Sequence, residues 1–168
     1  MKSMFFRAAA LMLLMSLTWT LAASGWVESY RTAKNQALRE NKKILIFFTG
    51  SDWCGEGQTL ERNLFRTDAF QRLAAEKYVL YRADFPKYTR LGQEKEENNR
   101  RLARRYGITR FPAVVVADPK FGSMLARQIG MADGMTPKKL LEKLAAIETG
   151  PAKANRLRPA VPEEKPKK

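Results

Sequence analysis

A single cysteine, Cys54, is the residue of this sequence best suited to covalent chemistry. It lies in the run S-D-W-C-G-E-G, residues 51–57. A cysteine thiolate is a nucleophile that can attack a disulfide. Disulfide exchange completed within one site requires a second thiol three positions later, and that position is Gly57. One thiol can still form a mixed disulfide, but another molecule's thiol, or the substrate's own second thiol, must then release it.

The rest of the composition excludes several other kinds of site. The chain has no histidine, which rules out a cysteine–histidine nucleophile pair and any histidine-bearing metal site. One thiol is too few for a thiolate zinc site, so we expect no metal and no cofactor. A single cysteine cannot form an internal disulfide. Three interpretations stay open for Cys54: a mixed disulfide with a partner protein, a Cys54-linked dimer, or a buried inert side chain.

The residues around Cys54 predict a strand, a turn and a helix. The apolar run 43–49 is typical of a buried strand, residues 50–53 form the turn, and residues 55–66 follow as a helix. Similar patterns predict the other elements: helices over 26–41, about 67–76, 93–106 and from 137 onward, strands over 78–84, 113–117 and 124–130, and a loop over 85–92. A strand hairpin follows a β-α-β portion, so the order predicts an α/β fold with a central mixed sheet flanked by helices.

The two ends of the chain differ in composition from the part between them. Lys2 and Arg7 precede an apolar run over residues 8–21, and small residues follow, as in a signal peptide. We therefore expect residues 1–23 to be a signal peptide and the protein to be exported, to the periplasm or beyond. Residues 24–150 form one domain, and the basic, proline- and lysine-rich stretch 151–168 is expected to be disordered.

The formal net charge of +14 makes the chain strongly basic. For an exported protein the anionic partners are lipid head groups or wall polymers, so we expect weak binding to envelope surfaces and no binding to nucleic acid. Four arginines, Arg100, Arg101, Arg104 and Arg105, share one broad face of the predicted helix 93–106. That face is either simply solvated or contributes to binding an anionic surface.

Two separated motifs agree with the order of elements. One is Trp53-Cys54-Gly55 at the strand-to-helix turn, and the other is G-I-T-R-F-P, residues 107–112, directly before the buried strand 113–117. Together they resemble the thioredoxin superfamily over roughly residues 26–147. The run F-T-G-S-D-W-C-G, residues 48–55, resembles in particular the exported bacterial thioredoxin-like proteins.

The resemblance implies a role for each residue near the thiol. Cys54 is expected to be the catalytic residue, and the family's cis-proline beside the thiol corresponds to Pro112. The residues expected to contact substrate are Trp53, Gly55, Glu56, Phe111 and Pro112.

The chain also departs from the family pattern. Gly57 replaces the resolving cysteine, and the family's buried acid would fall near Phe47 or Phe48, neither of which can accept a proton. Asp52 and Glu56 place negative charge on both sides of Cys54, which opposes formation of the thiolate.

These departures leave three hypotheses for the function. The first is thiol–disulfide exchange with protein thiols and disulfides through Cys54, as a monothiol reductase or isomerase-like protein. The second is a redox-inactive thioredoxin-fold module that binds protein segments beside Pro112. The third is a basic adaptor to envelope polymers in which the thiol is incidental.

Overall fold

The computed structural model describes residues 25–130 and 134–149. The expected signal peptide, residues 1–23, and the expected tail, residues 151–168, lie outside the described residues. Within the described ranges, the helices are all too short or too polar to cross a membrane.

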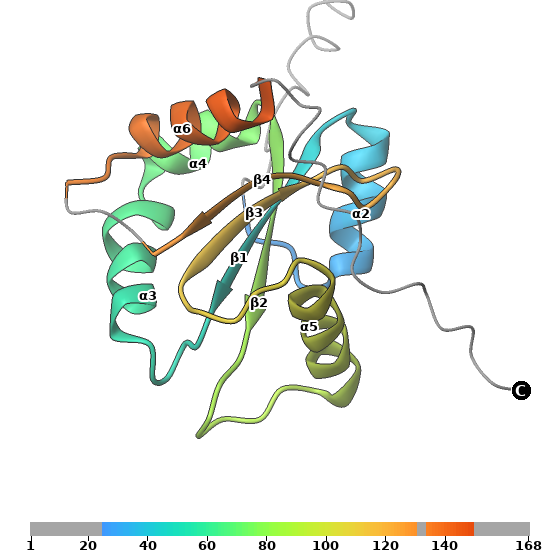
Figure 1. The fold of residues 1–168 in the computed structure, drawn as a ribbon, viewed down its shortest axis with the longest axis vertical. Coiled ribbons are helices and arrows are strands. Elements are labelled where there is room, and N and C mark those ends of the chain that lie inside the picture. The colour runs from blue at the N-terminus through green and yellow to red at the C-terminus, as the bar shows by residue number, and fades with distance from the viewer. Residues whose placement is uncertain (1–24, 131–133, 150–168) are drawn as a thin grey trace, which may run out of the picture.

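A mixed four-stranded sheet forms the centre of the molecule (Figure 1). The strand order is β2-β1-β3-β4, with β1 parallel to β2 and antiparallel to β3, and β3 antiparallel to β4. The mixed sheet expected from the sequence is therefore confirmed, and the apolar run of β3 is buried throughout. The strands are β1 (Lys43–Thr49), β2 (Tyr78–Asp84), β3 (Ala113–Ala117) and β4 (Met124–Ile129).

Helices cover both faces of this sheet. Figure 1 shows α2 and α5 on one side and α3, α4 and α6 on the other. A π-helical turn, η1 (Glu61–Phe65), continues α3. The α-helices are α2 (Tyr30–Arg39), α3 (Gly55–Leu60), α4 (Asp68–Ala75), α5 (Gln93–Arg105) and α6 (Pro137–Thr149).

Successive residues of β1 alternate between two hydrophobic cores, as the side-chain period of a strand requires. Phe48 points into the core shared with α2 and α5, where it packs near Tyr106 at a ring-centroid distance of 6.5 Å. Phe47 points into the opposite core and contacts Phe65 of η1 at 4.5 Å. Both phenylalanines are fully buried. Because β1 is fixed on both faces, its carboxyl end is a rigid support for the turn that follows.

The first predicted helix was wrong at its beginning. Val27 is extended and forms a parallel bridge with Tyr81, and its amide donates to the carbonyl of Leu80 at 2.9 Å. The helix begins only at Tyr30, because Ser29 caps it by accepting a hydrogen bond from the Thr32 amide. The apolar spacing over residues 26–30 suits a helix, but pairing with the edge of β2 overrides it.

Candidate functional site

Cys54 is a free thiol at the carboxyl end of β1. It is the N-cap residue of α3, and its amide donates to the Gly50 carbonyl at 2.8 Å. Its own carbonyl accepts from the Gln58 amide at 2.9 Å, in the first turn of the helix. The residue is 7% exposed, so the thiol lies mostly inside the protein, at the point where strand passes into helix.

The segment before β3 brings Phe111 and Pro112 to the same end of the sheet. The Phe111–Pro112 peptide bond is cis, Pro112 is buried, and its carbonyl accepts from the Gly130 amide at 2.8 Å. Phe111 makes an edge-to-face contact with Trp53, with 5.8 Å between ring centroids. The structure thus brings together the residue before Cys54 and the residue before Pro112, two motifs separated by more than fifty positions in sequence.

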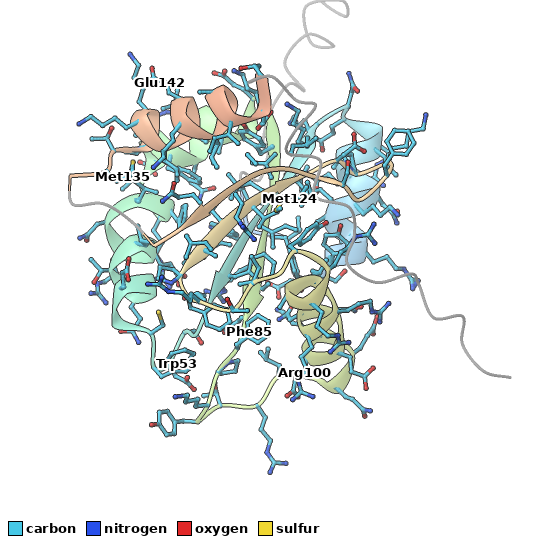
Figure 2. All side chains as sticks on the ribbon, in the orientation of Figure 1. Trp53, Phe85, Arg100, Met124, Met135 and Glu142 are labelled. Atoms are coloured by element: carbon cyan, nitrogen blue, oxygen red, sulfur yellow. The ribbon has the colours of Figure 1, made fainter. Side chains whose placement is uncertain are left out.

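Trp53 is partly buried and partly exposed. Its indole nitrogen donates to the carbonyl of Phe85 at 2.7 Å, and the Lys87 ammonium lies 4.3 Å from the ring centroid. The indole lies so close to Gly50 that a Cβ there would be 2.2 Å from the indole nitrogen. The side chain keeps 36% of its surface exposed. Figure 2 shows Trp53 and Phe85 at the end of the sheet where α3 begins.

The Asp52 side chain binds the loop after β2. Its carboxylate accepts hydrogen bonds from the backbone amides of Lys87, Tyr88 and Thr89 and from the Thr89 hydroxyl, at 2.8–3.2 Å. Partial desolvation raises the pKa of the Asp52 carboxyl, but these hydrogen bonds lower it by more, so the net pKa lies below the usual range. Sequence analysis considered only the charge of Asp52 beside Cys54 and did not predict that four donors on this loop bind its carboxylate.

We call residues 85–89 the clamped loop, since Asp52 and Trp53 both hold it. The side chains of Asp52 and Trp53 make five hydrogen bonds to this short segment. The clamped loop also borders a groove of about 470 Å³ toward the start of α5. The groove is lined by Asp84, Phe85, Pro86, Lys87, Thr89, Arg90, Leu91, Gln93, Glu96 and Arg100.

Thr49 and Gly57 lie beside each other next to the thiol, and we call them the floor of the site. Gly57 is buried in α3, and a Cβ placed there would be 2.2 Å from the Thr49 hydroxyl oxygen and 3.3 Å from the Cys54 sulfur. Thr49 is 1% exposed, and its hydroxyl has no hydrogen-bond partner in the part of the chain that the structure describes. An unpaired buried polar group costs about 1–3 kcal/mol. Sequence analysis missed Thr49; its only signal is a hydroxyl at the end of an apolar run.

The remaining predicted residues lie at the surface. Gly55 and Glu56 are exposed at the start of α3, and a Cβ on Gly55 would meet no other atom within 4 Å. The Glu56 carboxylate reaches toward the end of β4, within 3.6 Å of the position of a Cβ at Gly130. Sequence analysis did not single out Asp84, whose buried carboxylate accepts from the Ser51 amide at 2.8 Å.

The four arginines predicted to share one face of α5 differ in exposure and in their partners. Arg100, Arg101 and Arg104 are exposed, and Arg100 pairs with Glu96 one turn earlier. Arg105 instead donates to the carbonyls of Gly122 and Phe121, so it holds the β3–β4 turn. Across the described ranges, no three cysteine, aspartate or glutamate side chains converge as metal ligands.

Comparison with known proteins agrees with this geometry. A family model described as thioredoxin-like matches residues 25–119. Disulfide bond reductase DsbH of Chlamydia pneumoniae is 32% identical over 100 residues, a stretch that spans only 60% of this chain and 60% of that protein. A solved DsbH oxidoreductase superposes with a TM-score of 0.66 at 28% identity, covering 79% of this chain and 93% of that one.

A more distant solved structure shows the fold alone. A thioredoxin from Thermus thermophilus superposes with a TM-score of 0.53 at 21% identity, covering 74% of this chain and 87% of that one. The motifs, the sheet order and the family match all point the same way, and the chain belongs to the thioredoxin-like family.

Proposed function

We propose that the protein takes part in thiol–disulfide exchange through Cys54, as a monothiol reductase or isomerase-like protein. The observation that carries this proposal is the placement of the thiol. Cys54 lies at the strand-to-helix turn with Trp53 on one side, and Trp53 in turn contacts Phe111, next to Pro112. The similarity to proteins named as a disulfide reductase and an oxidoreductase supports the same class of reaction.

The proposed first step is attack by the Cys54 thiolate on one sulfur of a substrate disulfide. The new S–S bond forms as the substrate S–S bond breaks, and the departing substrate sulfur takes the negative charge and then a proton. Because position 57 is glycine, no second thiol of this chain can release the mixed disulfide. The substrate's other thiol releases it during isomerisation, with no net oxidation. During reduction, a first external thiol attacks the Cys54 sulfur and frees the substrate thiol. A second external thiol then releases Cys54, and the two external thiols supply the two electrons and end as a disulfide.

The residues around the thiol have separate roles in this proposal. Trp53 presents an exposed indole edge, and Gly55 and Glu56 form the exposed start of α3. Phe111 and Pro112 form the facing wall. An extended segment of the substrate would lie between these two groups, with its disulfide over Cys54.

Substituting Cys54→Ser tests this function directly. We expect loss of glutathione-dependent reduction of a model protein disulfide and loss of the ability to reactivate scrambled ribonuclease. Wild-type protein alkylated at Cys54 is the matched control, because it keeps the native backbone and blocks the same atom. Activity that persists in both proteins would overturn the proposal.

A redox-inactive binding module is the second candidate, and the glycine at position 57 favours it. In that case Cys54→Ser keeps its protein partner, and mass spectrometry of the protein from its native compartment finds an unmodified thiol. Under the exchange proposal the same measurement finds a fraction of Cys54 in mixed disulfides. A Cys54-linked dimer would appear as twice the chain mass that disappears on reduction.

We also propose that the protein works outside the cytoplasm, where disulfides persist. The pattern of residues 1–23 supports export, and the basic composition supports weak attraction to anionic envelope surfaces. N-terminal sequencing of protein recovered from the periplasmic fraction tests the first point. Salt-sensitive binding to anionic vesicles, compared with neutral ones, tests the second.

A further inference from the structure

The Thr49 hydroxyl is a buried donor without an acceptor. Thr49 is 1% exposed, and its oxygen makes no hydrogen bond with any described residue. Its own carbonyl is used normally, accepting from the Phe85 amide at 2.8 Å. Buried polar side chains are nearly always paired in folded proteins, so an orphan beside a reactive group points to a partner that is present only part of the time.

The unpaired Thr49 hydroxyl and the Cys54 sulfur both lie next to the Cα of Gly57. The position of a Cβ on Gly57 would be 2.2 Å from the Thr49 oxygen and 3.3 Å from the sulfur. Only a glycine at position 57 leaves room there for the Thr49 hydroxyl. The Thr49 side chain therefore occupies the volume that a side chain at position 57 would fill, directly beside the thiol.

We propose that Thr49 is a positioning residue whose hydroxyl donates a hydrogen bond to the Cys54 sulfur when that sulfur is negatively charged. The proposal rests on the exchange function proposed above for its role in turnover. Hydrogen bonds to charged acceptors are shorter and stronger than those between neutral groups, so a thiolate would draw in a hydroxyl that leaves a neutral thiol alone.

The negative charge appears on Cys54 at two points of the reaction. It is present before attack, when the thiolate breaks the substrate disulfide and forms the mixed disulfide. It reappears on release, when an incoming thiolate bonds to the substrate sulfur and Cys54 departs with the electron pair. Thr49 would stabilise Cys54 as nucleophile and as leaving group alike, and it loses no proton in either step.

Several other donors in the neighbouring segments are already engaged. The Lys87 ammonium lies over the Trp53 ring, and the amides of residues 87–89 are bound to Asp52. The Cys54 amide itself is bonded to the Gly50 carbonyl. Among the side chains described near the thiol, Thr49 thus combines burial with an unused donor.

The test is the pH dependence of alkylation of Cys54 by iodoacetamide in wild-type protein and in Thr49→Val. Valine keeps the shape of threonine without the hydroxyl. We expect the pH midpoint of alkylation to rise by about one unit, which slows the reaction about tenfold below the midpoint. Thr49→Ser, which keeps a hydroxyl, should restore the wild-type profile.

The comparison isolates the hydroxyl because no charge changes. The charged side chains of the surrounding elements are the same in every variant: Asp52, Glu56, Asp84, Lys87 and Arg110. Thr59→Val, on the exposed face of α3, is the control for the same chemical change away from the floor. Because Thr49→Val removes an unpaired buried hydroxyl, its urea midpoint should equal or exceed that of wild type.

Two outcomes would overturn the proposal. One is an unchanged alkylation profile in folded Thr49→Val. The other is a shift that Thr49→Ser fails to reverse, which would mean that shape rather than hydrogen bonding matters. If the valine variant does not fold, Thr49→Ala takes its place in the same comparison. Alkylation needs no disulfide substrate, so a failure of the exchange function leaves this test unaffected and the two failures remain distinguishable.

Discussion

The clamped loop and the floor belong to the same site, but the polar groups of the loop are paired and the hydroxyl of the floor is not. In the clamped loop, one carboxylate satisfies three successive backbone amides, and an indole satisfies a carbonyl. In the floor, a buried hydroxyl has no partner among the described residues, and it occupies the space that a side chain at position 57 would fill. The first arrangement favours a single rigid geometry. The second keeps an unused donor next to a reactive atom.

This difference means that the shape of the substrate-facing surface and the reactivity of the thiol depend on different residues. The two residues before Cys54 maintain the surface that a substrate would meet, through contacts more than thirty positions away in sequence. The floor lies next to the sulfur, which is 3.3 Å from the position of a Cβ on Gly57. A site can therefore keep its binding surface while its thiol chemistry is altered. Substitutions on the two sides should have separable effects.

Gly50→Ala should have the largest effect on stability, because it disrupts the clamp. A Cβ at position 50 would come within 2.2–2.8 Å of three atoms of the Trp53 indole. The indole must move, which breaks its hydrogen bond to Phe85 and its contact with Phe111. We expect a loss of about 2–3 kcal/mol in the free energy of unfolding, measured by urea denaturation followed by circular dichroism.

Gly55→Ala is the matched control for that change. Its Cβ would meet nothing within 4 Å, and it lies in the first turn of α3. It should leave stability unchanged or raise it by up to about 1 kcal/mol, since alanine favours helix over glycine. Equal stability of the two alanine variants would show that the indole clamp contributes little.

Gly57→Cys should have an intermediate effect and probes the floor. Its Cβ would overlap the Thr49 hydroxyl oxygen at 2.2 Å, so we expect a loss of about 1–2 kcal/mol from overpacking. Thr49→Ala removes the overlapping atom. The double variant should recover most of the loss and should also form an internal disulfide with Cys54, detected as two thiols fewer in mass spectrometry after alkylation.

Gly57→Ala, alone and with Thr49→Ala, separates the overlap from the new sulfur. A double-mutant cycle in urea denaturation gives the coupling between positions 49 and 57. If the two substitutions are additive, Thr49 does not occupy the space of a residue-57 side chain. Gain of dithiol reductase activity by the double variant alone would show that the rest of the site is intact.

Asp52→Asn should have the smallest effect, and one that depends on pH. The hydrogen bonds of the clamped loop lower the pKa of the Asp52 carboxyl in the folded protein. Its contribution to stability is therefore complete above the usual aspartate pKa of about 4, and it is lost as pH falls through the lower folded-state value. Asparagine has no such titration, so the stability difference between wild type and variant should shrink in acid.

Urea midpoints measured from neutral pH down to about pH 3 follow this difference. Glu76→Gln, at the exposed end of α4, controls for the loss of one negative charge. A difference that stays constant, or that grows in acid, would mean that Asp52 does not hold the loop through its charged form.

Local pattern was enough to predict most of the fold. The strands at 78–84 and 113–117 were predicted at their observed bounds, because each is a short run of β-formers with turn residues beside it. The helix predicted over about 67–76 is observed as α4, and Thr67 caps it because its hydroxyl accepts a hydrogen bond from the Phe70 amide. The extended start at Val27 was not predicted, because its partner Tyr81 lies more than fifty residues away.

The candidate site was predictable only in part, for the same reason. The motifs identified the thiol and the proline segment, because each is a local run with a recognisable composition. They did not predict the contacts of Asp52 with the amides at 87–89, or the contact of Thr49 with the space beside Gly57. Which side chains meet is fixed by the packing of β1 against its two cores, and that packing is not visible in a short stretch of sequence.

The contact between Trp53 and the clamped loop also gives the protein an optical reporter of its own site. Trp26 is packed against Phe47 and Phe65 in the core beneath α3, so its emission follows global unfolding. Trp53 adjoins the reactive sulfur and keeps an exposed edge, so its emission responds to whatever becomes bonded to Cys54. In protein that lacks residues 1–23, and with them Trp19, replacing Trp26 by phenylalanine leaves Trp53 as the single tryptophan, and fluorescence then follows formation and release of a mixed disulfide in real time.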